Sequence, residues 1–497
     1  MTVPVIVALD CSTSACKAVV FDLSGETVCE SRRYVTTTSP RPGWYEQDAT
    51  QWAEGLADAL TSVADLLPPS HRPLALGITH QRETFVCVDR DHHPIRPAIL
   101  WLDNRAEEQV ARLGGDAVQA ATGKPRSTLP SLYKLAWLAE HEPDTLRRTH
   151  QVLDVHAYVS HYLTGVAVTS WASADSTALV DLATRDWSPE LLRAAGLTRQ
   201  QVPELAAPGD RIGGLRPEVA RRTGLPVGLP VVAGAGDGQC AGIGVGGLAP
   251  GTAYLNLGTS FSLGAFVPGR PTYPGLRTMA APVPGHSAVE TLQPVGGMTL
   301  DWARDLLSAP DRSAVEAAAA EVPPGAGGLL FLPYLGGRET PVHRSDVRGA
   351  VLGLGGRHGA AELLRAVVEG LAHDQRDCLD LLRQATGADL RRVIVTGGFA
   401  QSALVVRIFS DVLGVPTAVA PEREGTALGA AVVAAAAGPD APYADVPTAA
   451  RHMTRPAATV AVDAHAAEYH EAVRPLRAGV LAGFDATEHA LTALRHL

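Results

Sequence analysis

Two strand–turn–strand segments that share one plan constrain the fold of this chain more than any other feature. The first joins apolar runs at residues 3–9 and 18–23 through a turn of small and polar residues. The second, at residues 251–267, begins about 245 positions later and joins two apolar runs through a turn at 258–260. A repeated hairpin of this kind indicates that the chain consists of two related halves.

The length and the order of the predicted elements support this division. With 497 residues, the chain suits two domains of roughly 250 residues each better than one compact core. We place the boundary after residue 247, which predicts domains 1–247 and 248–497. The apolar spacing predicts further strands at 74–78, 84–89 and 392–395, and helices at 106–113, 132–141, 154–163 and 361–382. Such alternation indicates an α/β architecture in which helices cover the sheets.

Several stretches rich in Gly, Ala or Pro are interpreted by composition. Residues 224–250 are expected to form the crossing between the halves, and residues 438–460 to run along the surface before a last helix. A glycine pair at 397–398 is expected to open a helix. The Ala-rich run 427–437 is too short to cross a bilayer and predicts a packed helix.

Charge and composition exclude some function classes. The net charge is −10, whereas affinity for a nucleic-acid backbone needs clustered Lys and Arg, so we expect no nucleic-acid partner. The six cysteines form no Cys-x-x-Cys pair, which favours reduced thiols over a disulfide framework or a zinc site. There is no basic leader and no run of 18 apolar residues, so we expect a cytoplasmic protein that does not enter a membrane.

The turns of the two hairpins carry candidate phosphate ligands. Small residues let backbone amides approach phosphate oxygens, while Thr13 adds a hydroxyl and Lys17 a positive charge. Asp10, at the end of the first strand, is placed to hold Mg²⁺. A plain hairpin with a polar turn explains these residues equally well. The second turn offers the same chemistry at Gly258 and Thr259, and a nucleotide held between two domains needs an anchor from each.

Asp237 stands in a stretch of small residues that follows the apolar run 229–232. A carboxylate in such a position can face a cleft and accept the proton of a nucleophile during phosphoryl transfer. It can also cap the helix that follows, and the local sequence favours this second interpretation.

A further polar group, Gln81, Arg82 and Glu83, interrupts an apolar strand region. The Arg–Glu pair can form a structural salt bridge, or it can present donors and an acceptor to the hydroxyls of a polyol. Trp101 and Asp103 lie downstream and add an aromatic wall and another carboxylate. The local sequence leaves both interpretations open.

In this order, the segments resemble the FGGY carbohydrate kinases, the family that contains xylulokinase, glycerol kinase, gluconokinase and ribulokinase. The resemblance runs from Val5 to about Ala437. Its most specific part is GAVLGL at 349–354, followed after seven residues by ELLRAVVE at 362–369. The segment around Lys134, Trp137 and residues 140–141 also matches, except at Leu129.

The resemblance implies two actin/Hsp70-like (ribonuclease H-like) ATPase domains with a deep cleft between them. It implies an ATP-dependent kinase that uses Mg²⁺ to phosphorylate a hydroxyl of a small sugar or polyol, and it leaves a homodimer open. Asp237 becomes the expected catalytic base and, with Asp10, an expected Mg²⁺ ligand, which reverses the local interpretation. The residues expected to bind ATP are Asp10, Thr13, Ser14, Lys17, Gly258, Thr259, Gly297, Gly397, Gly398 and Ser402. The residues expected to bind the sugar are Gln81, Arg82, Glu83, Trp101, Asp103 and Asp237.

Three residues depart from the family pattern. Ser12 replaces a glycine in the first turn, a small change that still permits close approach to a phosphate. Phe399 replaces a third glycine or an alanine after the glycine pair, and is expected to reshape the adenine pocket. Leu129 stands where glycerol kinases have a tyrosine that faces the substrate, which argues against glycerol.

The substrate-side segments resemble two branches of the family. QRET at 81–84 has the glycerol-kinase-like form, whereas PAILW at 97–101 and FLPYLGGRETP at 331–341 resemble the xylulokinase branch. We expect a pentulose such as D-xylulose, with ribulose, glycerol, erythritol and gluconate as alternatives. The alternatives from other classes are a non-catalytic ATP-binding protein of the actin/Hsp70 type and a nucleotide-regulated sugar sensor.

Overall fold

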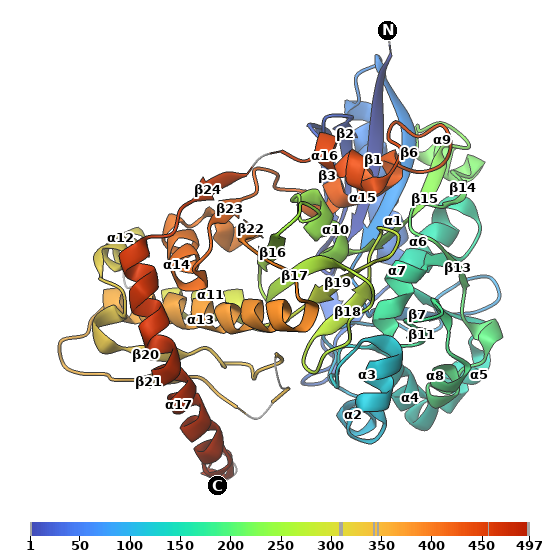
Figure 1. Ribbon diagram of the computed structural model, residues 1–497. Coiled ribbons are helices and arrows are strands. Elements are labelled where there is room, and N and C mark those ends of the chain that lie inside the picture. The colour runs from blue at the N-terminus through green and yellow to red at the C-terminus, as the bar shows by residue number, and fades with distance from the viewer. Residues whose placement is uncertain (1, 308–311, 341–342, 345–346, 456, 495–497) are drawn as a thin grey trace.

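The computed structural model describes residues 2–307, 312–340, 343–344, 347–455 and 457–494. Two lobes lie side by side in Figure 1, one built mainly from the first half of the chain and one from the second. Among the described residues, the first lobe is built around a six-stranded sheet and the second around a seven-stranded sheet. Both sheets are mixed and covered by helices, which confirms the predicted α/β class.

The first sheet has the strand order β14-β15-β6-β1-β2-β3. Its strands are β1 (Val3–Cys11), β2 (Ala15–Asp22), β3 (Thr27–Tyr34), β6 (His71–His80), β14 (Arg211–Gly214) and β15 (Pro230–Gly236). β1 runs antiparallel to β2 and parallel to β6. The turn between β1 and β2 is shorter than predicted, because Asp10 and Lys17 still pair within the ladder and only residues 12–14 lie outside it.

The two faces of β1 contact different helices, which is why its apolar run is continuous. Val7 and Leu9 pack in the cluster that contains α1 and α6, whereas Ile6 and Ala8 pack in the cluster that contains α10 and α15. These helices are α1 (Thr50–Leu66), α6 (Val155–Thr164), α10 (Asp237–Gly244) and α15 (Gly425–Ala435). The Ala-rich segment is thus a packed helix, as predicted, but it is buried against the sheet of the first lobe.

Glycines let α10 and α15 meet backbone to backbone. A Cβ atom on Gly429 would lie 1.9 Å from the carbonyl oxygen of Cys240, and one on Gly244 would lie 1.9 Å from that of Gly425. Only residues without a side chain permit this approach. The stretch 224–250 is therefore more than the predicted crossing, because it contains β15, a buried strand of the first sheet, and α10, a helix that contacts this strand and α15.

A smaller sheet, with the order β4-β5-β8-β7-β9, lies beside the first. Its strands are β4 (Thr37–Thr38), β5 (Glu46–Gln47), β7 (Phe85–Val88), β8 (Ala98–Ile99) and β9 (Gln151–Asp154). The helices of this part of the chain are α2 (Glu107–Leu113), α3 (Asp116–Thr122), α4 (Ser131–His141), α5 (Pro143–Arg148), α7 (Trp171–Ala174), α8 (Pro189–Ala194) and α9 (Pro217–Thr223). Short strands connect them, namely β10 (Val168–Ser170), β11 (Val180–Asp181), β12 (Asp186–Trp187) and β13 (Glu204–Ala206).

The second sheet has the order β18-β19-β17-β16-β22-β23-β24. Its strands are β16 (Thr252–Leu257), β17 (Phe261–Pro268), β18 (Arg277–Ala280), β19 (His286–Glu290), β22 (Arg392–Thr396), β23 (Thr417–Val419) and β24 (Ala458–Val460). The main helices around it are α11 (Gly296–Leu307), α12 (Arg312–Glu321), α13 (Ala360–Thr386) and α14 (Ala403–Leu413), with a hairpin of β20 (Leu330–Leu332) and β21 (Ala350–Leu352). The predicted second hairpin is confirmed as β16 and β17, which pair antiparallel.

The glycine pair at 397–398 does open helical structure: Gly397 is the N-cap of a short 3₁₀ turn (Gly398–Gln401), and α14 follows it. One prediction about the second half is wrong. Residues 438–460 are not only a surface segment: they contain α16 (Val446–Met453), which packs on the first lobe, and β24, which pairs with β23. The chain then continues into α17 (Ala464–Leu494), shown in red in Figure 1. No helix in the described part of the chain is long and apolar enough to span a membrane.

Candidate functional site

A pocket between the two halves brings together most of the residues predicted on the sugar side. The first half contributes Arg82, Glu83, Trp101 and Asp237 to its lining. The second half contributes Asn256, Ser260, Arg277, Thr396 and Thr426, among others. A molecule bound in this pocket would therefore contact both halves at once.

Asp237 is the first residue of α10 and follows the buried strand β15. The N-cap is Gly236, so Asp237 does not cap the helix in the way that the local sequence favours. Its Oδ1 accepts from its neighbour Gly238 N at 2.9 Å and lies 3.3 Å from Arg82 Nε. Although the side chain is 40% exposed, burial within the pocket raises the pKa of Asp237, and the positive charge of Arg82 partly opposes this. Such a group can bind and release a proton closer to neutrality than an ordinary Asp.

Arg82 and Glu83 both form ion pairs with the opposite half. Arg82 Nη1 donates to Glu290 Oε2 at 2.8 Å, and Arg277 Nη2 donates to Glu83 Oε1. Arg277 on β18 and Glu290 on β19 lie opposite each other in the second sheet. The adjacent residues Arg82 and Glu83 therefore form their ion pairs with two adjacent strands of that sheet. Burial alone would raise the pKa of Glu290, but Arg82 and Arg277 hold it below its ordinary value. Arg82 and Glu83 therefore each form a salt bridge, with Glu290 and Arg277 instead of with each other, and both also line the pocket.

A chain of hydrogen bonds connects the first turn with the sugar-side residues. Trp101 Nε1 donates to Thr13 Oγ1 at 2.9 Å, and Thr13 Oγ1 donates to Gln81 Oε1 at 3.0 Å. Gln81 Nε2 in turn donates to Gln47 Oε1 at 3.2 Å. Gln81 is buried, so it holds Thr13 and Trp101 in place behind the pocket surface instead of lining it.

Asp10 and Lys17 lie opposite each other at the end of the first hairpin. Lys17 Nζ is 3.9 Å from Asp10 Oδ2 and donates to Glu424 Oε2 at 2.7 Å. Burial raises the pKa of Asp10 to about 7, although Lys17 acts against this rise. Ser14 is exposed at the tip of the turn.

The buried Oδ1 of Asp10 has no hydrogen-bond partner among the described residues. A buried carboxylate oxygen without a partner is costly unless a ligand satisfies it. Carboxylate oxygens are the ligands that Mg²⁺ prefers. The unpartnered Oδ1 of Asp10 therefore fits the predicted Mg²⁺, and the charge of Asp237 also acts to raise the pKa of Asp10.

The second turn and the glycine pair come together in the second lobe. Gly297 N donates to Thr259 O at 2.9 Å, and a Cβ atom on Gly297 would lie 2.0 Å from Gly258 O. Gly397 has φ +94, and a Cβ atom there would lie 2.7 Å from Asn256 Oδ1. These positions therefore need glycine for close packing and backbone conformation.

A second pocket lies beside the glycine pair 397–398. Thr396, Gly397, Gly398, Gln401 and Glu422 belong to its lining. Thr396 lines the first pocket too, so the two pockets adjoin. The predicted ATP-side residues Gly397 and Gly398 thus lie next to the pocket that contains Asp237.

Comparisons with known proteins agree with this geometry. Residues 5–244 match the N-terminal domain of the FGGY family of carbohydrate kinases, and residues 253–438 match its C-terminal domain. The chain belongs to the FGGY family. It is 32% identical over 415 residues to xylulose kinase of Escherichia coli K12, which covers 82% of this chain and 84% of that protein. It is also 32% identical over 458 residues to glycerol kinase of Chloroflexus aggregans, covering 86% and 89% of the two chains.

Solved structures show the same fold for this FGGY kinase. The crystal structure of xylulose kinase from Rhodospirillum rubrum matches with a TM-score of 0.90 and 28% identity, over 98% of this chain and 100% of that chain. The protein is therefore a two-domain, ATP-dependent carbohydrate kinase that acts on a small sugar substrate.

Two predicted site residues of the FGGY kinase are occupied by structural contacts. Asp103 is fully buried: its Oδ1 accepts from Arg105 Nε at 2.8 Å and its Oδ2 from Tyr45 N at 2.6 Å. It lies outside the lining of the first pocket. Ser402 Oγ accepts from Val405 N at 3.4 Å and caps α14. Their predicted ligand contacts would have to form in addition to these bonds.

Several residues that line the pocket of this FGGY kinase, or that pair with its predicted site residues, were not predicted from the sequence. Arg277, Glu290 and Glu424 act on residues about 200 or more positions away, and no local pattern reveals such pairs. Asn256 was detectable, because its amide side chain interrupts the largely apolar strand end 253–257. A polar residue in such a strand often faces a ligand or a buried partner.

Proposed function

We propose that this kinase transfers the γ-phosphate of ATP to a hydroxyl of a pentulose such as D-xylulose, with Asp237 as general base. The observation that carries the proposal is the place of Asp237: it lies in a pocket lined by both halves, beside the glycines of the second lobe. A kinase must bring its acceptor and its nucleotide together at such a boundary.

Asp237 and the residues that contact it can carry out the proton transfer. The acceptor hydroxyl binds against Asp237, whose Oδ1 is held by Arg82 and Gly238 N, so that Oδ2 can accept the hydroxyl proton. As the proton moves to the carboxylate, the acceptor oxygen forms a bond to the γ-phosphorus and the bond to the β-phosphate oxygen breaks, which releases ADP. Lys17 and the backbone amides of the two turns would neutralise the phosphate charge.

Mg²⁺ would be held by Asp10 and Asp237, and when bound it would offset charge on the phosphates. Asp10 is suited to this because its Oδ1 is buried and without a partner among the described residues. Closure of the two halves over the pocket would exclude water that could otherwise hydrolyse ATP.

The choice of a pentulose rests on sequence relatives and on one departure. Xylulose kinases of E. coli and Lactococcus lactis are among the most similar curated relatives, and glycerol kinases also match. Leu129 replaces the tyrosine that the glycerol-kinase pattern has on the substrate side, which favours the pentulose. In the structure, Leu129 O accepts from the buried Lys134 Nζ at 2.5 Å, so this segment is fixed close to Trp101.

The test is ADP release measured by a coupled assay with a panel of D-xylulose, D-ribulose, L-ribulose, glycerol, erythritol and gluconate. We expect release that depends on the acceptor and is fastest with D-xylulose. Asp237→Asn should lower kcat by at least about 10²-fold and keep ATP binding. Asp389→Asn, at a carboxylate that is 79% exposed, is the matched control and should behave like the wild type. Near-normal turnover by Asp237→Asn would contradict the assignment of the base.

A further inference from the structure

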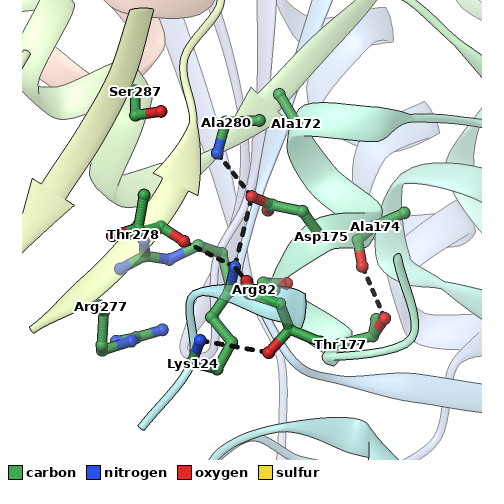
Figure 2. Close-up of polar contacts among 12 residues, drawn as sticks. Arg82, Lys124, Ala172, Ala174, Asp175, Thr177, Arg277, Thr278, Ala280 and Ser287 are labelled. Carbon is green, nitrogen blue, oxygen red and sulfur yellow. Dashed lines mark hydrogen bonds and ion pairs between the residues drawn. The ribbon is translucent and has the colours of Figure 1, made fainter. Parts of the chain in front are cut away.

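A buried lysine–aspartate pair lies at the contact between the two halves. Lys124 directly follows α3 and the turn at Gly123, and Asp175 begins a short 3₁₀ turn after α7. Lys124 Nζ is 3.4 Å from Asp175 Oδ2, and each side chain is only 2% exposed. Figure 2 shows both side chains beside the strand of the second half that carries Thr278 and Ala280.

The pair holds the backbone of β18 at two points. Lys124 Nζ donates to Thr278 O at 2.8 Å, and Asp175 Oδ2 accepts from Ala280 N at 2.5 Å. Thr278 N also donates to Gly123 O at 2.8 Å. The first half therefore binds a strand of the second half on both sides of Met279.

The residue that precedes Thr278 on β18 is part of the pocket that contains Asp237. Arg277 is the first residue of β18, lines the pocket that contains Asp237, and pairs with Glu83. Because Thr278 is fixed by Lys124 and Gly123, the backbone from which the Arg277 side chain starts is fixed relative to the first half. A shift of β18 would change the place of Arg277 and of its partner Glu83 in the pocket.

Stability alone does not explain a lysine and an aspartate in this place. A buried ion pair loses about as much in desolvation as it gains in attraction, and apolar residues of similar volume often replace one without loss of stability. Moreover, Asp175 Oδ1 is buried and has no hydrogen-bond partner among the described residues. What the pair supplies, and apolar residues could not, is directional bonds to the backbone of β18.

We propose that Lys124 and Asp175 are positioning residues of the acceptor site, which act by holding β18 so that Arg277 contacts an oxygen of the bound sugar. This rests on the proposed function, because it presupposes that the sugar binds in the pocket of Asp237. Arg277 can take this role because a guanidinium carries five N–H donors and the bond to Glu83 occupies only part of this set. The sugar is thus held by residues from both halves.

The experiment compares KM for D-xylulose with KM for ATP in purified full-length variants. Lys124→Met and Asp175→Asn should each raise the acceptor KM by about tenfold, the loss of one hydrogen bond to a charged group, and leave the ATP KM within about twofold. Arg277→Ala should have the same selective effect. Lys124→Arg keeps the charge and a donor, and should restore most of the acceptor affinity.

A double variant tests whether the pair acts through Arg277. If it does, Lys124→Met combined with Arg277→Ala should raise the acceptor KM no further than Arg277→Ala alone. The matched control is Arg270→Met, because Arg270 Nη1 also donates across the halves, to Ala183 O, but lies outside β18. This control should leave both KM values unchanged.

Breaking a buried pair can prevent folding, so the pair is also replaced as a whole by Lys124→Met with Asp175→Leu. We expect a folded protein with the same selective rise in acceptor KM. Four results would each overturn the inference. These are an unchanged acceptor KM, an equal change of both KM values, an additive effect with Arg277→Ala, and a double replacement that does not fold. If the wild type releases no ADP with any acceptor, the proposed function itself fails and the inference falls with it, whereas a normal wild type with unaffected variants overturns the inference alone.

Discussion

Arg82 Nε lies 3.3 Å from Oδ1 of Asp237, while the Nη1 atom of the same guanidinium donates to Glu290 at 2.8 Å. One side chain thus connects the proposed base with a carboxylate of the other half that is fully buried. Arg82 therefore has two separable effects, one on the charge next to the proposed base and one on the contact between the halves.

The variant Arg82→Met should lower the free energy of unfolding by about 3–5 kcal/mol, because it leaves the charge of Glu290 buried without its partner. Adding Glu290→Gln should recover much of this stability, since the remaining amide is neutral. It should not restore turnover, because Asp237 still lacks its positive neighbour. Urea unfolding and kcat measured on the same samples check both parts, and recovery of turnover together with stability would show that Arg82 acts only on the fold.

The pair between Lys17 and Glu424 predicts opposite effects on nucleotide binding. Lys17→Met should raise the KM for ATP by about tenfold, because it removes a positive charge from the first turn. Glu424→Gln should lower the KM for ATP, because Lys17 no longer has a carboxylate at 2.7 Å with which the phosphates must compete. Glu30→Gln is the control, since Glu30 contacts Arg32 but not Lys17. A higher ATP KM in Glu424→Gln would mean that the pair aligns Lys17 instead of occupying it.

The glycine contact between α10 and α15 predicts a severe packing defect. Gly429→Ala would place a Cβ atom 1.9 Å from the carbonyl oxygen of Cys240, so the helices must separate. We expect a loss of about 3 kcal/mol in stability and a lower kcat, because Asp237 begins α10. Gly479→Ala in α17 meets no heavy atom within 4 Å and should be neutral or slightly stabilising. Thermal unfolding of the two variants makes the comparison, and equal melting temperatures would contradict the close contact.

A buried histidine predicts how stability changes below neutral pH. His156 is fully buried, accepts from Gly234 N through Nε2 at 3.2 Å, and has a pKa lowered to about 4 by burial. The unfolded chain binds a proton near pH 6.5 and the folded chain only near pH 4, so the stability due to neutral His156 is present above pH 6.5 and lost as the pH falls toward 4.

The variant His156→Gln stays neutral and can keep an acceptor for Gly234 N, so it should lose less stability in acid. The quantity to compare is the free energy of unfolding of the variant minus that of the wild type. This difference should rise by about 2 kcal/mol when the pH is lowered from 7 to 4.5. His93→Gln, at an exposed side chain, should show no such difference. Urea unfolding at both pH values measures this, and parallel pH profiles of His156→Gln and the wild type would contradict it.

The sequence alone was sufficient for the two hairpins and for the plan of two halves in an α/β fold. The apolar runs at residues 3–9 and 251–267 predicted the two hairpins, because buried strands need continuous apolar side chains whatever lies on either side of them. The family resemblance placed Asp237 and Arg82 in one site, and both do line one pocket. These features can be predicted from one sequence, because they depend on local residue patterns or on the order of motifs along the chain.

What only the tertiary structure decided are the contacts between distant segments. The sequence does not show that α15 would cover the first sheet, that Glu424 would hold Lys17, or that Arg277 would pair with Glu83. Nor could it separate Asp103, which is held by Arg105 and Tyr45, from residues that line the pocket. The physical reason is that local propensity reports on neighbours along the chain, whereas ion pairs and helix packing depend on which surfaces meet after the halves have folded.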